Sequence, residues 1–428
     1  MQKLTIGFLP VGDMKTEDMK RDIDAAIKAL KGRRLEIVSR PASSNLQELL
    51  AYAKELESAR LDTLVLFCVH GSQALNLVRV AEGTRLPVMI WALPTRYSLP
   101  ASASAIGNLR EKGFRVKLFY GAADSNPTAE ELLRITKALH AVRRLREARI
   151  GKIGGLQGGA YVSGNFNKEA LHDRFGVEVV DIRVKEVMDA FEEVGEEQVE
   201  GALKEWRRRF HFIEAGEQDL RRATRLHLAV KGLFERYGLS ALAMDLYEEI
   251  GQIFRTSSFL TFCEDLVMQY EGDVISIVAT LLVKYLRDNP VYLTDIFSID
   301  LEKSLLTVVH ASAPASLAQD DSRVHIGTDI PPLDFGDYTI VTCKPEIPPG
   351  PVTILRLFGR NCDQVHLTTG QLLSCDIKKE MIANIKITGD IKKFLDTVCG
   401  NHYLVVPGDI RKDLYEACEW LDIKIIET

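Results

Sequence analysis

The residues best suited to chemistry in this sequence are concentrated in an acidic stretch between positions 245 and 273. The stretch contains Asp245, Glu248, Glu249, Glu264, Asp265, Glu271 and Asp273. Glu271 and Asp273 stand directly before the apolar helical pattern VISIVATLLVKYL. Asp273 alone is explained equally well as a helix N-cap, whose carboxylate accepts a free backbone N–H. Glu271 beside a hydrophobic core costs free energy unless it is neutralised, and a divalent metal ion would neutralise both carboxylates.

Histidine supplies a second type of ligand. His402 lies in CGNHY, before the strand-like run LVVPGD, while His310 and His325 lie in VVHASAP and RVHIGTD. Taken singly, a histidine at such a position is more often hydrogen-bonded scaffold than ligand. The sequence has no HExxH and no clustered Cys/His spacing, which argues against a zinc site. It also lacks G-x-S-x-G, which argues against the serine nucleophile of an α/β-hydrolase.

A glycine-rich loop is the third candidate. Gly151, Gly154, Gly155, Gly158 and Gly159 follow a predicted strand, as the glycines of a phosphate-binding loop do. Their spacing is not G-x-G-x-x-G, and no acidic residue stands clearly at the end of the next strand to bind a ribose. We therefore favour a structural turn, or a backbone that lines a neutral ligand, and predict no NAD site.

Three domains are expected to position these residues. Residues 1–148 alternate apolar strand patterns (4–10, 35–39, 61–69, 88–92 and 115–120) with amphipathic helical ones, which predicts a parallel sheet with right-handed crossovers. Residues 149–303 begin a second unit of this type. From 304 to 428, short strand-like runs are separated by Gly, Pro and Asp turns. The predicted fold class is α/β, with two Rossmann-like parallel-sheet α/β domains followed by a β-rich, barrel-like C-terminal domain.

Composition limits which kinds of partner and which cellular compartment are expected. The 428 residues are 46% hydrophobic and 27% charged, as in a globular protein, and 54 Lys and Arg against 60 Asp and Glu give a net charge of −6. That balance argues against nucleic acid as a partner. No run approaches ~18 apolar residues, so we expect neither a signal segment nor a membrane span. The seven scattered cysteines contain no CxxC pair, which fits a cytoplasmic protein.

Several short motifs, taken in order, resemble the L-fucose isomerase/L-arabinose isomerase superfamily. The first domain contributes LDTLVLFCVHGS, LPVMIWALP and YSLPASASA, and the second contributes IGKIGG and RFGVEVVDI. EGDVISIVATLL, PVYLTDIF, VVHASAP, GPVTILRLFG and CGNHYLVVPGD follow in the order of the family's catalytic half. Each motif is weak alone, but the resemblance extends over nearly the whole chain.

The resemblance implies a divalent-metal-dependent aldose–ketose isomerase. Asp273 and His402 match metal ligands of the family, and Glu264 is the best match for the second acidic ligand, with Asp265 or Asp245 as alternatives. Glu271 would bind the ion or stand next to its ligands. The ion would be Mn²⁺, or else Mg²⁺ or Co²⁺, because oxygen-rich ligation with open positions suits such ions.

By the same resemblance, Glu264 and Asp273 would be the acid/base pair that moves a proton between C2 and C1 of the sugar. An ene-diolate would form, and the metal ion would stabilise its charge. His310, Asn401 and Ser98 are the expected substrate contacts. Family members are usually homo-oligomers, here a trimer or hexamer, in which the first domain contributes to a neighbour's site. The loops at residues 70–72 and 96–98 would then serve that role, although they are equally explained as strand-end turns.

Departures from the family's pattern leave two further hypotheses open. The loop GLQGGAY is small where the family often has a bulky aromatic residue, Tyr97 replaces the asparagine commonly found before SLPA, and the acidic stretch before EGD is shorter. They predict a substrate other than fucose or arabinose. They also fit the alternative of a non-catalytic sugar-binding or regulatory protein that retains the isomerase fold. A nucleotide-dependent enzyme that uses the glycine loop is the third and weakest hypothesis.

Overall fold

The computed structural model describes the chain except for residues 1–3, 33–34, 155–165, 246–248, 265 and 332–335. The chain divides into two compact units, Met1–Arg143 and Arg144–Thr428. The second unit contains both a parallel sheet and a barrel-like antiparallel sheet, which confirms the predicted fold class. The predicted boundary at 303/304 stays a prediction, since it lies within this unit. No helix in the described part of the chain is long and apolar enough to span a membrane.

The first unit is built on a five-stranded parallel sheet in the order β2-β1-β3-β4-β5. The strands are β1 (Leu4–Val11), β2 (Leu35–Ser39), β3 (Thr63–Cys68), β4 (Val88–Ala92) and β5 (Val116–Tyr120). Every residue of β3 and β4 is buried, which is why these strands read as unbroken apolar runs. Their sequence patterns thus predicted the sheet correctly.

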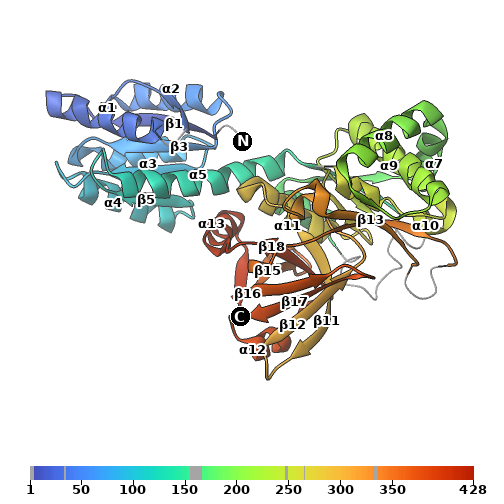
Figure 1. Cartoon of the computed structure of the whole chain (residues 1–428). Coiled ribbons are helices and arrows are strands. Elements are labelled where there is room, and N and C mark those ends of the chain that lie inside the picture. The colour runs from blue at the N-terminus through green and yellow to red at the C-terminus, as the bar shows by residue number, and fades with distance from the viewer. Residues whose placement is uncertain (1–3, 33–34, 155–165, 246–248, 265, 332–335) are drawn as a thin grey trace. The chain divides into compact units, whose positions relative to one another are not determined.

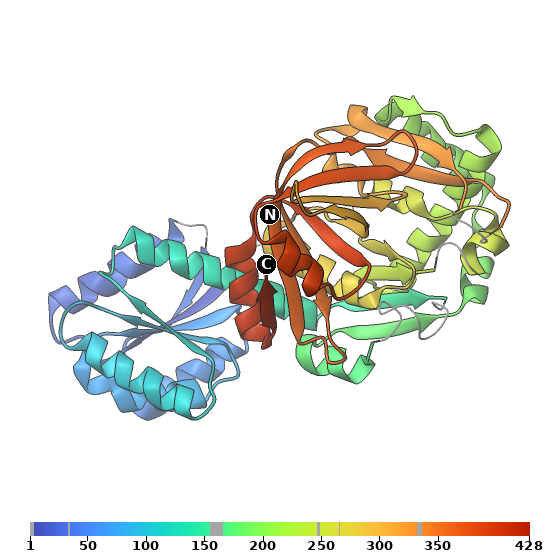
Figure 2. The ribbon, with the colours of Figure 1, turned by 90° about the horizontal axis from the view of Figure 1, so that it is seen from below.

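Helices cover both faces of this sheet (Figure 2). They are α1 (Glu17–Lys31), α2 (Leu46–Glu57), α3 (Ala74–Glu82), α4 (Ser98–Glu111) and α5 (Asn126–Arg146). Buried side chains of α2, α3 and α4 form one core with β1, β3 and β4. Asp62, directly before β3, contacts α5: its Oδ1 lies 2.9 Å from His140 Nδ1 and accepts a 2.8 Å hydrogen bond from Arg143 Nε.

The second unit begins with a four-stranded parallel sheet in the order β10-β9-β6-β7. Its strands are β6 (Arg149–Ile153), β7 (Glu178–Ile182), β9 (Ala241–Met244) and β10 (Met268–Tyr270). The helices of this part are α6 (Lys168–Phe175), α7 (Val184–Glu193), α8 (Glu196–Arg209), α9 (Glu217–Tyr237), α10 (Glu249–Phe254) and α11 (Val274–Arg287). The four strands run in one direction, so the residues that follow them share one edge of the sheet.

Six antiparallel strands close into a barrel in the same unit (Figure 1). They are β11 (Tyr292–Asp300), β12 (Leu305–His310), β15 (Gly350–Phe358), β16 (Gln364–Asp376), β17 (Met381–Ile387) and β18 (His402–Pro407). Pairing of β15 with both β16 and β18 completes the ring. Aliphatic and tyrosine side chains from all six strands fill the interior, and α12 (Ile391–Asp396) packs onto that core through Ile391 and Phe394.

Two strand pairings in this unit extend across position 304. Strand β11 lies before that position, yet it pairs with β12 and β18 and belongs to the barrel. Strands β13 (Val324–Asp329) and β14 (Ile340–Pro345) lie after it, yet they form a separate sheet with β8 (Phe212–Ile213). Pairing between strands so distant in sequence cannot be inferred from local hydrophobic pattern.

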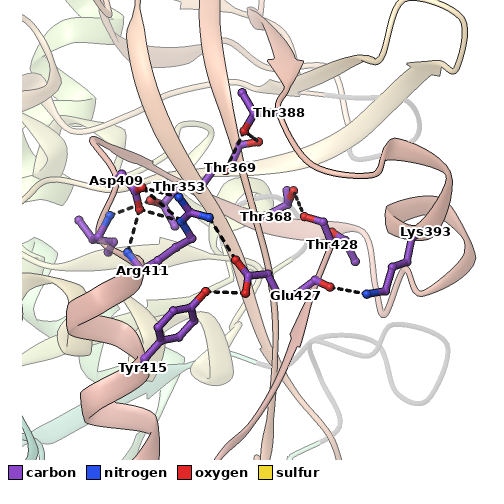
Figure 3. Close-up of polar contacts among 11 residues, drawn as sticks. Thr353, Thr368, Thr369, Thr388, Lys393, Asp409, Arg411, Tyr415, Glu427 and Thr428 are labelled. Carbon is purple, nitrogen blue, oxygen red and sulfur yellow. Dashed lines mark hydrogen bonds and ion pairs between the residues drawn. The ribbon is translucent and has the colours of Figure 1, made fainter.

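The last strand, β19 (Lys424–Glu427), extends the barrel sheet by pairing in parallel with β16 after α13 (Arg411–Leu421). Figure 3 shows how side chains fix it. Glu427 accepts hydrogen bonds from Arg411 Nη1 at 3.2 Å and from the Tyr415 hydroxyl, and Lys393 Nζ donates to the Glu427 carbonyl at 2.7 Å. Thr368 Oγ1 donates to the Thr428 carbonyl at 2.8 Å. Polar contacts on both sides therefore hold β19 in register.

Candidate functional site

The acidic motif before α11 forms a tight connection between strand and helix. Glu271 and Gly272 follow β10 and have positive φ angles of 56° and 64°, which turn the chain sharply. Asp273 then caps α11, since its Oδ1 accepts the N–H of Ser276 at 2.9 Å. The N-cap interpretation of Asp273 is confirmed. Its other oxygen is directed at a residue 129 positions later in the chain.

That residue is His402, the first residue of β18 and fully buried. The barrel places two more polar residues beside it. Asp295 of β11 pairs with His402 in register, and His310 ends the neighbouring strand β12. The barrel strands thus bring three polar residues together, from segments far apart in the sequence, at the turn that carries Glu271.

The two nitrogens of His402 face different carboxylates. Nδ1 lies 2.9 Å from Asp273 Oδ2, which also accepts the hydroxyl of Ser276 at 2.7 Å. Nε2 lies 3.2 Å from Glu271 Oε2 and 3.7 Å from Asp295 Oδ1, and it makes no hydrogen bond with the described residues. Since Asp273 accepts the Nδ1 proton, Nε2 is the ring nitrogen directed toward the oxygens of Glu271 and Asp295. A carboxylate that orients a histidine in this way is common behind metal-binding imidazoles.

Electrostatics at this position favour a positive charge. Burial disfavours the charged imidazole, but the neighbouring carboxylates of Asp273 and Glu271 outweigh it and raise the pKa of His402 to about 10. Burial likewise opposes ionisation of Glu271 and Asp273, and His402 outweighs it, so that the pKa of each carboxyl is lowered. The buried carboxylate of Asp273 and the half-buried one of Glu271 therefore require a proton or another cation at His402.

His310 lies in the same group of polar atoms, as a hydrogen-bond donor. One ligand-type atom each of Glu271, His310 and His402 lies within 4.8 Å of the others. The His310 ring stacks on Tyr270 with 3.9 Å between ring centroids, and burial lowers the pKa of His310 to about 4. Its Nδ1 accepts the N–H of Ala311 at 2.9 Å, so the neutral ring carries its proton on Nε2. That Nε2 is buried without a hydrogen-bond partner among the described residues, and it is a donor available to a ligand oxygen.

The structure places Glu264 elsewhere. It precedes β10, whereas Glu271 follows that strand, and its carboxylate lies 3.1 Å from His227 Nε2 and 2.9 Å from Lys231 Nζ. These two partners outweigh burial and lower the pKa of Glu264 to about 2. It is therefore not one of the residues brought together at His402.

Of the two alternatives to Glu264, Asp265 lies outside the described residues, and Asp245 lies at the sheet edge that also carries Glu271. Asp245 follows β9, and Met244 pairs with Tyr270 in the register of β9 and β10. Asp245 and Glu271 therefore hold equivalent positions on neighbouring strands. Asp245 Oδ2 also accepts the N–H of Glu249 at 2.7 Å.

The remaining predicted residues divide between the two units. Asn401 lies at the site, where its Nδ2 donates to Asp295 Oδ1 at 2.7 Å. Ser98 is fully buried in the first unit, where its hydroxyl donates to the Cys68 carbonyl at 2.7 Å and accepts the N–H of Leu93 at 2.9 Å. These bonds are those of a strand-end turn, and the substrate role of Ser98 stays a prediction. Of the glycine loop, 155, 158 and 159 lie outside the described residues.

Asp295 is the site residue that the sequence analysis missed. Its only local signal is a single acidic residue inside the apolar strand pattern VYLTDIF, since a carboxylate there needs a partner. The partners, Asn401 and His402, lie over a hundred positions away and become neighbours only through the pairing of β11 with β18.

Comparison with known proteins identifies two similar enzymes. The chain is 22% identical to the sulfoquinovose isomerases of Priestia aryabhattai and Priestia megaterium, over 453 aligned residues that cover 99% of each chain. This full-length similarity supports the prediction of a sugar isomerase. No protein-family model matches the chain.

Among solved structures, a periplasmic solute-binding protein from Actinobacillus succinogenes with bound D-allose aligns with 66% of this chain and 92% of its own. An arabinose-binding protein from Geobacillus stearothermophilus aligns with 67% and 89%. They are 11% and 9% identical to this chain, with TM-scores of 0.20 and 0.19, which are too low to establish a common fold.

Proposed function

We propose that the protein is a divalent-metal-dependent aldose–ketose isomerase, with sulfoquinovose as the first substrate to test. One observation carries the proposal: the buried Nε2 of His402, which makes no hydrogen bond with the described residues, faces the carboxylates of Glu271 and Asp295. It occurs in a chain that is similar over its full length to two sulfoquinovose isomerases. The L-fucose/L-arabinose isomerase resemblance is consistent with the same activity.

The residues present fit a hard divalent ion. Glu271 and His402 Nε2 are the proposed ligands, with Asp295 and Asp245 completing an acidic rim. Asp245 takes the role predicted for Glu264. When bound, Mn²⁺, or Mg²⁺ or Co²⁺ in its place, supplies a Lewis acid that stabilises negative charge on the sugar's carbonyl oxygen.

The chain's own residues supply orientation and proton transfer. Asp273 holds the Nδ1 proton of His402 and so keeps the Nε2 lone pair directed at the site. His310 hydrogen-bonds a sugar oxygen through its Nε2–H and relays the proton of the C2 hydroxyl to O1, so that its ring is neutral before and after the reaction. Asp295, whose side chain is 35% exposed, removes the proton from C2 and returns it to C1, so that the reaction needs no external oxidant or reductant. Asp273 itself is fully buried with its oxygens engaged by Ser276 and His402, which supports an orienting role.

Two further expectations belong to this proposal. We propose a homo-oligomer, a trimer or hexamer, by resemblance to the family. We also propose a cytoplasmic location, which fits seven cysteines that all lack disulfide bonds.

The deciding experiment combines metal analysis with a turnover screen. We expect the purified protein to bind about one Mn²⁺ per chain and to convert sulfoquinovose, or another member of a panel of pentoses, hexoses and deoxy or sulfonated sugars, to its ketose. His402→Ala should abolish both. Asp273→Asn should weaken Mn²⁺ binding about 10- to 100-fold, as loss of a ligand-orienting carboxylate does.

His325→Gln is the control, since His325 pairs with Glu346 in the separate sheet of β13 and β14 and should leave both properties intact. Metal-independent turnover would exclude the proposed chemistry. Saccharide binding without turnover, even with added Mn²⁺, would support the non-catalytic alternative.

A further inference from the structure

A buried cation lies directly behind the proposed ligand His402. Arg356 of β15 is 2% exposed, and its Nη1 donates a 2.6 Å hydrogen bond to the carbonyl of His402. Its Nε and Nη2 have no hydrogen-bond partner in the described part of the chain. Burying a guanidinium with so few partners costs free energy, which must be offset by what the residue does.

Strand geometry explains why the His402 carbonyl needs this donor. On one side of β18, Asn401 O accepts the N–H of Ile296, and Tyr403 O accepts the hydroxyl of Thr294. Successive carbonyls of a strand alternate in direction, so His402 O points to the other side, toward β15. The ladder of β15 and β18 ends at the pair Leu355 and Leu404, before it reaches His402. Arg356 replaces the missing backbone donor.

The residue before Asn401 is adapted to the guanidinium. A Cβ built on Gly400 would lie 2.6 Å from both Cζ and Nε of Arg356. Such an approach is far inside normal contact distance, so any larger residue at 400 would displace the arginine. Glycine at this position of the GNH motif therefore has two physical reasons: it makes room for Arg356, and its φ of 158° is one that L side chains rarely adopt.

A cross-strand neighbour of Arg356 holds the other end of the same segment. His366 of β16 pairs in register with Arg356, and its Nδ1 lies 2.6 Å from the Tyr403 hydroxyl. Its Nε2 lies 3.0 Å from Thr397 Oγ1. Two adjacent barrel residues therefore contact the segment 397–403. His366 binds Thr397 and Tyr403, and Arg356 contacts Gly400 and His402.

We propose that Arg356 is a positioning residue for His402, which fixes the first residue of β18 so that its imidazole stays aligned between Asp273 and the site. The inference rests on the proposed function for its link to metal binding. The positioning itself is a property of the metal-free chain and is testable there.

The first test measures the metal-free protein and its Mn²⁺ affinity side by side. We expect Arg356→Ala to increase backbone hydrogen–deuterium exchange in residues 397–404 and to weaken Mn²⁺ binding, measured by calorimetry, about 10- to 100-fold. Millimolar guanidinium should restore much of both. Arg360→Ala is the matched control, because Arg360 is exposed just beyond the end of β15. Unchanged exchange and affinity in Arg356→Ala would overturn the inference.

A double-mutant cycle tests the contact with Gly400 and does not depend on the Arg356→Ala variant alone. Gly400→Ala should weaken Mn²⁺ binding more in the native chain than in the Arg356→Ala background, because the strain at its φ of 158° is common to both and only the clash with Arg356 is removed. Equal effects in both backgrounds would contradict the proposal. If the native protein binds no Mn²⁺, the proposed function fails, while exchange in residues 397–404 still decides whether Arg356 positions His402.

Discussion

At the scale of single residues, Glu264 has the environment of a structural ion pair. His227 and Lys231 lower the pKa of its carboxyl to about 2, against an ordinary value of 4.5. A carboxyl with a depressed folded-state pKa contributes stability that is fully present above the unfolded pKa and is lost as the pH falls through the folded value. The contribution of Glu264 is therefore present above pH 4.5 and lost toward about pH 2.

We accordingly expect Glu264→Gln to keep its turnover and to lose stability at neutral pH. Removing the carboxylate also removes its pH dependence, so the urea midpoints of native and variant proteins should converge as the pH is lowered from 5 to 2.5. Asp245→Asn is the comparison, and it should reduce Mn²⁺ affinity without this convergence. A large loss of turnover in Glu264→Gln would restore the acid/base role that the family resemblance predicts.

The site residues differ in how clearly the sequence marks them. Glu271 and Asp273 were identifiable because a carboxylate beside a hydrophobic core costs free energy unless it is capped, paired or bound to a cation. His402 was identifiable only through the GNH motif, since its neighbours are distant in sequence. Asp295 was missed, because the pairing of β11 with β18 that makes it a neighbour of His402 has no local signature.

At the scale of elements, closure of the barrel depends on a glycine in its longest strand. β16 pairs with β19 through residues 364–367 and with β17 from Gly370 onward, so Gly370 marks the change of partner. A Cβ there would lie 2.6 Å from Ile385 Cγ2 and 2.8 Å from the Lys386 carbonyl oxygen. The backbone oxygen cannot move without disturbing the β17 ladder.

We expect Gly370→Ala to lower the free energy of unfolding by about 1–3 kcal/mol, the usual cost of overpacking. Gly350→Ala is the control, because Gly350 begins β15 and its Cβ would meet nothing within 4 Å. Urea denaturation of the two variants checks the difference. Equal free energies of unfolding for the two variants would mean that β16 and β17 can move apart at this position.

Sequence patterns predicted these elements better than their partners. The parallel strands of the first unit read correctly because burial on both faces leaves unbroken apolar runs. The barrel was recognised as β-rich, but not its order β15-β18-β11-β12-β17-β16, nor the exclusion of β13 and β14. Strand order is decided by contacts over long sequence separations, and these contacts leave no periodicity in the chain.

At the scale of the whole molecule, the two compact units have separate cores, and the candidate site belongs to only one of them. The core formed with α2, α3 and α4 lies entirely within the first unit, and the barrel core lies within the second. Glu271, Asp295, His310 and His402 are all in the second unit. A ligand that binds only the folded second unit should stabilise that unit and leave the first unchanged.

Calorimetric unfolding should therefore show two transitions. Mn²⁺ should raise the midpoint temperature of only one of them, that of the second unit. At a free Mn²⁺ concentration of 100 times its dissociation constant, the expected stabilisation is about 2.7 kcal/mol, a shift of roughly 5 °C. His402→Ala should abolish that shift.

Asp62→Asn should lower the midpoint temperature of the first unit's transition by roughly 5–10 °C. Asp62 is 1% exposed and binds His140, Arg143 and the N–H of Thr5. A single transition, or one in which Mn²⁺ and Asp62→Asn act on the same step, would show that the units unfold together and that the metal site stabilises the entire chain.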